Sequence, residues 1–252
     1  MKTRFEDLRL LLIQARDTPE MEHQEQQCFI ERCKIEPYQL TCRNVVRDPI
    51  SADELADVDA FLIGGAGEYS AWTSYPWMEA LLSMIRDAHD AALPTFGSCW
   101  GHQLMARALG GEVKYDPERI EFGCCSVHLT DAGQEDPLFG KFPRTFEANM
   151  GHRDRVVVLP EGAIELARNE SQPNEAFRME GRPFYGTQFH SELDADRERE
   201  RLIAYRSHYV RELGSEELFQ EVLDDLVETS EVDSLMYDFL LEFALNGEAE
   251  RS

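Results

Sequence analysis

Residues 93–103 read LPTFGSCWGHQ, and this stretch decides the fold. A short apolar run ends at Gly97, and a segment of good helix formers begins after Cys99 and stops at Gly110 and Gly111. A corner of this kind, with glycines on either side of the central residue, is typical of a nucleophile elbow, because glycine lets the backbones of strand and helix pass close together. The pattern therefore predicts that Cys99 lies at a strained strand-to-helix corner. A helix N-terminus favours the thiolate form of such a cysteine.

A second motif supplies the groups that a cysteine nucleophile needs. The apolar and aromatic run that begins at Pro183 ends in His190, and Glu192 follows two residues later. Residues two apart in an extended chain lie on one face. A reactive thiol needs a base for its proton and a third group that fixes the imidazole tautomer. The sequence therefore predicts a triad of Cys99, His190 and Glu192.

His152 and Asp154 form a rival pair with the same spacing. Reacting groups in open parallel sheets collect beyond the carboxyl ends of strands. His190 follows a strand-like run, whereas His152 precedes one at residues 155–159, so we favour His190 as the base. His152 remains open as a pocket wall, a structural hydrogen-bonding residue or a base. His102 is interpreted as packing beneath the elbow.

The elbow and the histidine motif together resemble the class I glutamine amidotransferase domain of the guanylate synthetase type, over roughly residues 8–193. The resemblance implies that Cys99 attacks the side-chain amide of glutamine, forms a glutamyl thioester and releases ammonia and then glutamate, with no metal or organic cofactor. It implies that His190 acts as base and then acid and that Glu192 orients it. Ser98 departs from the family pattern, in which many members carry an aliphatic residue before the nucleophile.

The resemblance also implies further site residues. Gly64 and Gly65 end a strand-like run, and Gly65 matches the residue whose backbone N–H forms an oxyanion hole together with that of Trp100. Preorganised donors of this kind contribute about 2.7–4 kcal/mol each to catalysis. Without Cys99 and His190, we would interpret the glycine pair simply as a strand-to-loop turn; with them, we favour the donor role. Residues expected to bind substrate are Gly64, Gln103, Asn149, Gly151 and His152.

A metal site is the competing interpretation of the spacing between His190 and Glu192, because zinc deaminases combine H-x-E with C-x-x-C. The sequence contains no C-x-x-C. The remaining cysteines lack the spacing of metal ligands and are expected to be small buried hydrophobes: Cys28, Cys33, Cys42, Cys124 and Cys125. This cysteine usage, and an N-terminal segment that matches neither a signal peptide nor a membrane span, lead us to expect a reducing cytoplasm.

The strand and helix patterns predict an α/β fold with a doubly wound, mostly parallel sheet flanked by helices. Strand-like runs at 8–15, 38–46, 59–63 and 93–97 alternate with helical patterns such as 76–91. The later runs at 123–129, 156–159, 163–168 and 176–179 are short and predict a mixed sheet. We expect residues 1–193 to form this domain.

Residues 194–252 are expected to form a helical, acidic extension. The last 39 residues, from 214 onward, contain twelve acidic residues and one arginine, with apolar positions at helical spacing that predict two amphipathic helices. The extension either packs on the main domain or presents a docking surface.

The net charge of −24 argues against nonspecific binding to nucleic acid or anionic membranes, because like charges repel. Three functions stay open: donation of ammonia to a separate synthetase subunit, hydrolysis of γ-glutamyl peptides or amides, and a non-catalytic binding role. Assembly into a homo-oligomer also stays open.

Overall fold

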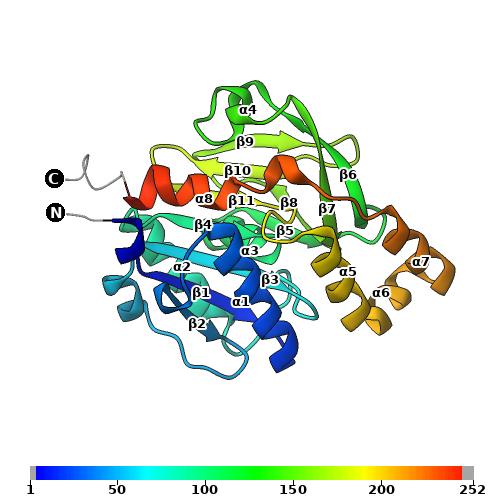
Figure 1. Cartoon of the computed structure of the whole chain (residues 1–252), viewed down its shortest axis with the longest axis horizontal. Coiled ribbons are helices and arrows are strands. Elements are labelled where there is room, and N and C mark those ends of the chain that lie inside the picture. The colour runs from blue at the N-terminus through cyan, green and yellow to red at the C-terminus, as the bar shows by residue number, and fades with distance from the viewer. Residues whose placement is uncertain (1–3, 246–252) are drawn as a thin grey trace.

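A nine-stranded mixed sheet forms the centre of the protein, which a computed structural model describes over residues 4–245 (Figure 1). The strand order is β2-β1-β3-β4-β11-β10-β9-β6-β7. The first five strands in this order pair in parallel: β2 (Leu40–Asn44), β1 (Leu10–Ala15), β3 (Ala60–Ala66), β4 (Thr95–Ser98) and β11 (Phe184–Thr187). The predicted α/β fold, with a mixed sheet that is parallel in this half and is flanked by helices, is confirmed.

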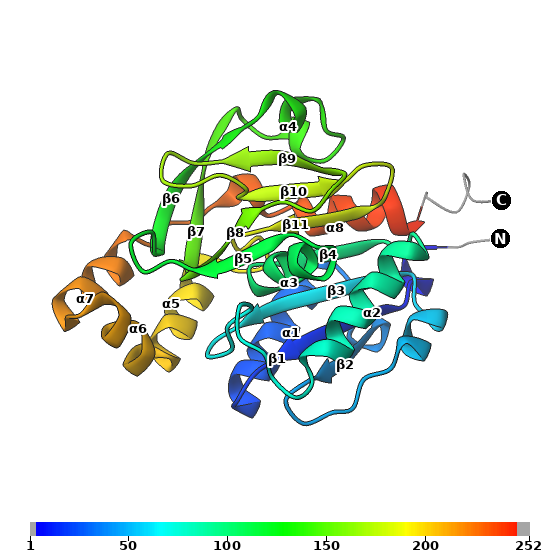
Figure 2. The same cartoon turned by 180° about the vertical axis from the view of Figure 1, so that it is seen from behind.

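The other half of the sheet is antiparallel, as the short later runs predicted. It consists of β10 (Ala176–Met179), β9 (Ala163–Arg168), β6 (Glu121–Leu129) and β7 (Thr145–His152). A separate ribbon pairs β5 (Glu112–Tyr115) with β8 (Asp154–Val158) beside α3 (Figure 2). The sequence patterns missed β5 and β7. His152 therefore ends a strand, which corrects the expectation that it only precedes one.

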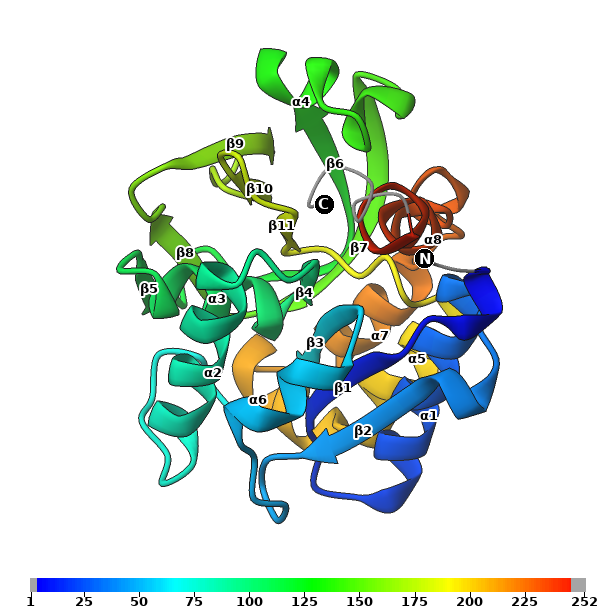
Figure 3. The same cartoon turned by 90° about the vertical axis from the view of Figure 1, so that its left-hand side faces the viewer.

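Helices cover both faces of the parallel half (Figure 3). One face carries α1 (Pro19–Cys33) and α8 (Leu235–Phe239), and the other carries α2 (Met78–Asp90) and α3 (Trp100–Ala108). The helical pattern at 76–91 is confirmed by α2, which buries Leu81, Met84 and Ile85. The shorter elements are α4 (Asp131–Glu135), 3-10 turns at Phe5–Asp7, Pro37–Gln39, Ala52–Asp57, Phe139–Lys141 and Ser230–Val232, and a π-helical turn at Leu240–Leu245.

Three further helices follow residue 193 and lie next to the carboxyl ends of the parallel strands: α5 (Ala195–Ala204), α6 (Arg206–Leu213) and α7 (Glu216–Asp225) (Figure 1). Their apolar side chains pack around Tyr209 and Phe219. The two amphipathic helices predicted for the extension correspond to α7 and α8. Met236 and Leu240 are buried in the main core, so this part of the extension packs on the domain. The last seven residues of the predicted extension, 246–252, lie outside the described residues.

No helix within residues 4–245 combines the length and the apolar character needed to cross a membrane.

Candidate active site

The carboxyl ends of four neighbouring parallel strands meet at one edge of the sheet. Arg16 follows β1, Gly67 follows β3, Cys99 follows β4, and His190 lies three residues beyond β11. Open α/β sheets bind ligands at this edge. All four residues line one cavity, so the topology assembles a site from segments that are far apart in the sequence.

The predicted elbow is present at Cys99, which lies between β4 and α3. Its backbone angles, φ 49° and ψ −98°, lie in a region that residues other than glycine rarely adopt. Its N–H donates to the carbonyl of Thr187 at 2.7 Å, which ties the corner to β11. A Cβ atom at Gly97 would lie 2.6 Å from the backbone of Gly101, and one at Gly101 would lie 2.3 Å from the carbonyl oxygen of Ile63. Both glycines are therefore required for the close approach of helix to strand.

The other two predicted triad residues lie beside this corner. His190 Nδ1 and Glu192 Oε1 are 2.7 Å apart, and both side chains are buried. Ser98 Oγ donates to Glu192 Oε2 at 2.7 Å, and Arg201 approaches Oε1 at 3.5 Å. The hydroxyl of Ser98 thus holds the second oxygen of the carboxylate. This contact gives a physical reason for the serine where many family members carry an aliphatic residue.

The electrostatics of the site favour charged forms of the histidine and the carboxylate. Burial opposes ionisation of Glu192, but His190, Arg201 and Ser98 outweigh it and lower the pKa of Glu192 to about 2. Burial likewise disfavours a charged His190, whereas the charges of Glu192 and Cys99 raise its pKa well above the usual value. A protonated His190 beside Cys99 is therefore the stable arrangement.

The two backbone N–H groups predicted to form the oxyanion hole differ in whether they already donate a hydrogen bond within the protein. Among residues 4–245, no hydrogen bond uses the backbone N–H of Trp100, the first residue of α3. The N–H of Gly65 instead donates to Glu25 Oε1 at 3.0 Å. A Cβ atom at Gly64 would lie 2.6 Å from the same oxygen. The oxyanion role of Gly65 stays a prediction, and it requires this N–H to part from Glu25.

Glu25 is a buried carboxylate that sequence reasoning did not single out. It is inaccessible to solvent, pairs with Arg16 at 2.5 Å and accepts a hydrogen bond from Gln14 at 2.7 Å. Burial opposes the charge of Arg16, but the attraction of Glu25 outweighs it and raises the pKa of the guanidinium. The pair fixes the end of β1 against the glycines Gly64 and Gly65, which lie within β3 near its carboxyl end.

We expect Glu25→Gln to lower the free energy of unfolding by about 3–5 kcal/mol, because it leaves the charge of Arg16 buried without its partner. Urea denaturation followed by circular dichroism measures this loss. Glu79→Gln is the matched control, since Glu79 pairs with Arg86 at 2.6 Å on the surface, where such pairs contribute about 0–1 kcal/mol. Equal losses in the two variants would contradict the role assigned to Glu25.

A small cavity opens on the α3 side of the nucleophile, with a volume of about 20 Å³. Its walls include four predicted residues: Trp100, Gln103, Gly151 and His152. The cavity is also lined by Cys99, Ala66, Gly67, Tyr69, Arg153, Asp154 and Tyr209. Gln103 Nε2 donates to the carbonyl of Asp154 at 2.6 Å and to Gln188 Oε1 at 3.0 Å. The amide of Gln188 in turn approaches the sulfur of Cys99 at 3.5 Å, so a chain of amides links pocket and nucleophile.

Two predicted substrate residues lie elsewhere. Asn149 is buried, and its amide donates to the carbonyl of Val227 at 2.9 Å. Its backbone carbonyl accepts the N–H of His190. Gly64 faces Glu25. Within the described part of the chain, neither Asn149 nor Gly64 lines the two cavities at Cys99. Their contacts in this structure are with other parts of the protein beside the site.

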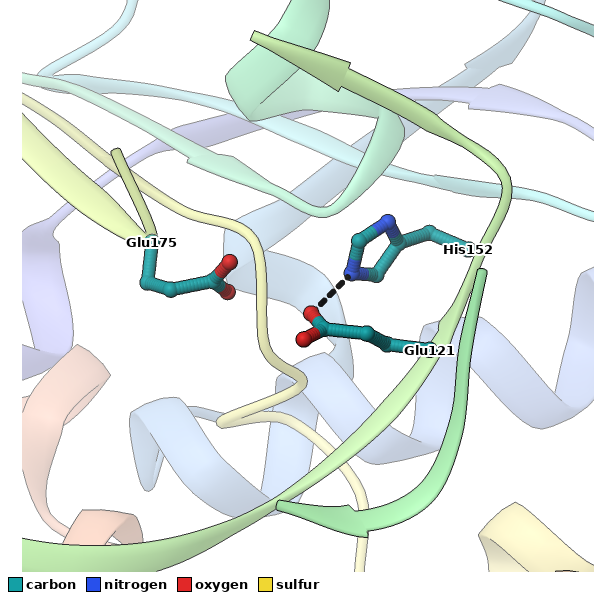
Figure 4. Close-up of side chains that lie close together, drawn as sticks. All are labelled: Glu121, His152 and Glu175. Carbon is teal, nitrogen blue, oxygen red and sulfur yellow. Dashed lines mark hydrogen bonds and ion pairs between the residues drawn. The ribbon is translucent and has the colours of Figure 1, made fainter. Parts of the chain in front are cut away.

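His152 belongs to a buried cluster with Glu121 and Glu175 (Figure 4). Its Nδ1 lies 3.1 Å from the carbonyl of Asp154, and its Nε2 lies 3.1 Å from Glu121. Both partners are acceptors, so the ring makes both contacts as a donor only when it is protonated. His152 thus has both of the non-catalytic roles left open for it, since it also forms a wall of the pocket.

The three side chains of this cluster place one ligand atom each within 4.8 Å of one another, which is the spacing of a candidate metal site. The oxygens of Glu121 already accept hydrogen bonds from Asn169, Ser171 and Gln172 as well as His152. Burial and the charge of Glu121 raise the pKa of Glu175 well above its usual value. With Glu175 favoured in its neutral form and the oxygens of Glu121 already accepting hydrogen bonds, the cluster carries less negative charge than two ionised carboxylates would.

The helices after residue 193 contribute to the site in a way that the sequence did not indicate. Glu198 and Arg201 of α5 and Tyr209 of α6 line a second cavity, which also includes Cys99 and His190. In the sequence, residues 194–201 look like a solvent-exposed run of charges. A domain boundary at 193 would therefore cut through the site.

The other five cysteines lie in surroundings that disfavour the thiolate form. Burial raises the pKa of Cys28, Cys42, Cys124 and Cys125 to about 12, and it raises the pKa of Cys33 as well. Thiols with such pKa values are poor nucleophiles at neutral pH.

Comparison with known proteins agrees with this geometry. The profile of the family described as glutamine amidotransferase class-I matches residues 30–207. The chain therefore belongs to the class I glutamine amidotransferases, which are cysteine-dependent enzymes.

Relatives within this family include GMP synthases. A glutamine-hydrolyzing GMP synthase subunit from Methanocaldococcus jannaschii is 39% identical over 118 residues, which cover 47% of this chain and 61% of the relative. The glutamine-hydrolyzing GMP synthase of Aliivibrio salmonicida is 39% identical over 104 residues, which cover 41% of this chain and 19% of the relative. The matches thus span less than two thirds of the length of these relatives.

Solved structures share the whole fold. A glutamine amidotransferase from Methylobacillus flagellatus aligns with a TM-score of 0.72 and 25% identity, covering 94% of this chain and 95% of the other. A glutamine amidotransferase from Thermotoga maritima aligns with a TM-score of 0.70 and 20% identity, covering 94% and 98%. Because these alignments cover 94% of the chain, they include most of the helices after residue 193.

Proposed function

We propose that this protein hydrolyses the side-chain amide of glutamine to glutamate and ammonia. The observation that carries the proposal is the position of Cys99, which lies at a strained elbow between the His190–Glu192 pair and the unused N–H of Trp100. A nucleophile, an acid–base group and an oxyanion donor thereby converge on one point. Family membership supports the choice of an amide substrate.

The first half of the reaction forms a thioester. The thiolate of Cys99 attacks the amide carbon of glutamine, and the carbonyl oxygen takes up negative charge that the N–H of Trp100 stabilises. The C–N bond then breaks, and protonated His190 donates its proton to the leaving nitrogen, which departs as ammonia. Glu192 keeps the imidazole oriented throughout.

The second half releases glutamate. Neutral His190 takes a proton from a water molecule, whose oxygen attacks the thioester carbon. The C–S bond breaks, the sulfur leaves as a thiolate, and His190 is protonated again, so the site returns to its starting state. These steps use only side chains and water.

We further propose that a separate synthetase subunit consumes the ammonia. Relatives of this chain carry the name of GMP synthase subunits, which supports a partner of this class. Hydrolysis of substituted γ-glutamyl amides or peptides is the alternative.

Incubation with glutamine tests the proposal. We expect equal amounts of glutamate and ammonia, with a higher kcat/KM for glutamine than for a γ-glutamyl dipeptide. Glutamate can be measured with a coupled dehydrogenase and ammonia by an independent colorimetric assay. A higher kcat/KM for the dipeptide would favour the alternative, and turnover of neither compound would contradict both.

A further inference from the structure

Two cavities meet at the nucleophile. Both include Cys99, Gly151 and Tyr209 in their walls, together with Ala66 and Gly67. The first contains Trp100 and Gln103. The second contains His190 and lies under the helices α5 and α6, where Glu198 and Arg201 complete it. The nucleophile thus lines both a space on the side of Trp100, called the outer cavity here, and a space on the side of His190, called the inner cavity.

The chemistry of the proposed reaction assigns different parts of the substrate to these spaces. The amide oxygen must lie at the N–H of Trp100, whereas the leaving nitrogen must lie within reach of His190, which protonates it. We propose that the inner cavity is a leaving-group chamber that binds ammonia after the first half-reaction and the attacking water in the second. This inference rests on the proposed function and deepens it by restricting the substrate to the unsubstituted amide.

The wall of the chamber is chemically suited to a small polar guest. Glu198 and Arg201 are 1% and 3% exposed. Glu198 Oε2 and Arg201 Nη2 have no hydrogen-bond partner among the described residues. Buried polar groups normally find partners. Ammonia or water can donate to the carboxyl oxygen and accept from the guanidinium, so one guest satisfies both groups.

The size of the chamber sets its selectivity. Its volume is about 10 Å³, and a cavity needs about 10–15 Å³ to hold one water molecule. Ammonia is similar in size to water. A Cβ atom added at Gly151 would lie 3.3 Å from Glu198 Oε1 and 3.6 Å from the hydroxyl of Tyr209, so the walls are already close together. The proposal therefore makes Glu198 the wall that a carbon substituent on the leaving nitrogen would meet.

The selectivity can be measured by comparing glutamine with γ-glutamylmethylamide. We expect the wild-type protein to prefer glutamine by about 100-fold in kcat/KM, which lies within the range of discrimination that binding pockets achieve for one methylene group. Glu198→Ala removes the wall and should reduce this preference for glutamine by about tenfold or more. Glu198→Gln preserves the size and should keep the preference. Asp196→Ala on the exposed face of the same helix is the control.

A second measurement uses only the wild-type protein, in case Glu198→Ala does not fold. By microscopic reversibility, amines that attack the thioester enter through the same chamber. During turnover of glutamine, ¹⁵N-ammonia should be incorporated into glutamine, whereas methylamine at an equal concentration of free base should give no γ-glutamylmethylamide.

The outcomes separate the two claims. Absence of glutamine turnover would overturn the proposed function itself. Turnover of glutamine with equal kcat/KM for the methylamide, or with formation of γ-glutamylmethylamide from methylamine, would overturn the chamber and leave the proposed function standing. If the Glu198→Ala protein folds and keeps the wild-type preference for glutamine over the methylamide, the chamber would also be overturned.

Discussion

Replacing Cys99 with alanine is expected to reduce the rate of glutamine hydrolysis by about 10⁶-fold, the size of effect seen when the nucleophile of a triad is removed. The physical reason is that the covalent intermediate forms on the sulfur of Cys99, and alanine has no nucleophilic atom at that position. Gln188 and Gln103 contact this region only through neutral amides. The assay is the release of glutamate at saturating glutamine, with enough protein to detect a very slow residual rate.

The fold should survive this substitution. Alanine has the same backbone restrictions as cysteine at φ 49°, so the strain at the elbow is unchanged, and only one sulfur atom is lost. Near-ultraviolet circular dichroism and the melting temperature check this. Cys124→Ala, which removes a half-buried thiol on β6, is the matched control and should retain full activity. Substantial activity in Cys99→Ala would refute the mechanism.

The second large effect is expected at His190. His190→Gln should also lower the rate by about 10⁶-fold, because it removes both the proton acceptor and the proton donor of the reaction. Glu192→Gln should be milder, about 10⁴-fold, because the imidazole remains but loses the charged partner 2.7 Å from its Nδ1. Measuring kcat for both variants in parallel tests this order of effects.

His128→Gln provides the control for histidine loss, since His128 lies on β6 and contacts Thr145 on the surface. It should leave kcat unchanged. If Glu192→Gln were slower than His190→Gln, the assigned roles would be reversed or the base would lie elsewhere. His152, the rival base of the sequence analysis, would then become the residue to test.

The parts of the site that the sequence predicted are those that short segments encode. The elbow depends on Gly97, Cys99 and Gly101, which lie within five residues of one another. The pair of His190 and Glu192 lies within three. Because a strand-like run precedes each motif, the sequence predicted that both lie at the same edge of a parallel sheet. The structure places them there, since β4 and β11 pair in parallel.

The parts that the sequence could not predict depend on contacts between distant segments. Glu25 lies in the interior of α1, and only the fold shows that it accepts a hydrogen bond from Gly65. Glu198 and Arg201 belong to a run of alternating charges that is indistinguishable from a solvated helix face until α5 is seen to cover His190. Ser98 appeared to be a departure from the family pattern because its partner, Glu192, is 94 residues away.

The most direct test of the account is intact-mass analysis after incubation with a diazo-ketone analogue of glutamine. We expect one covalent adduct, located on Cys99 by peptide mapping, slowed by glutamine and absent in Cys99→Ser. The five other thiols, whose pKa values are raised by burial, should remain unmodified. No adduct, or an adduct on another cysteine that glutamine does not protect, would contradict the claim that Cys99 is the nucleophile of a glutamine site.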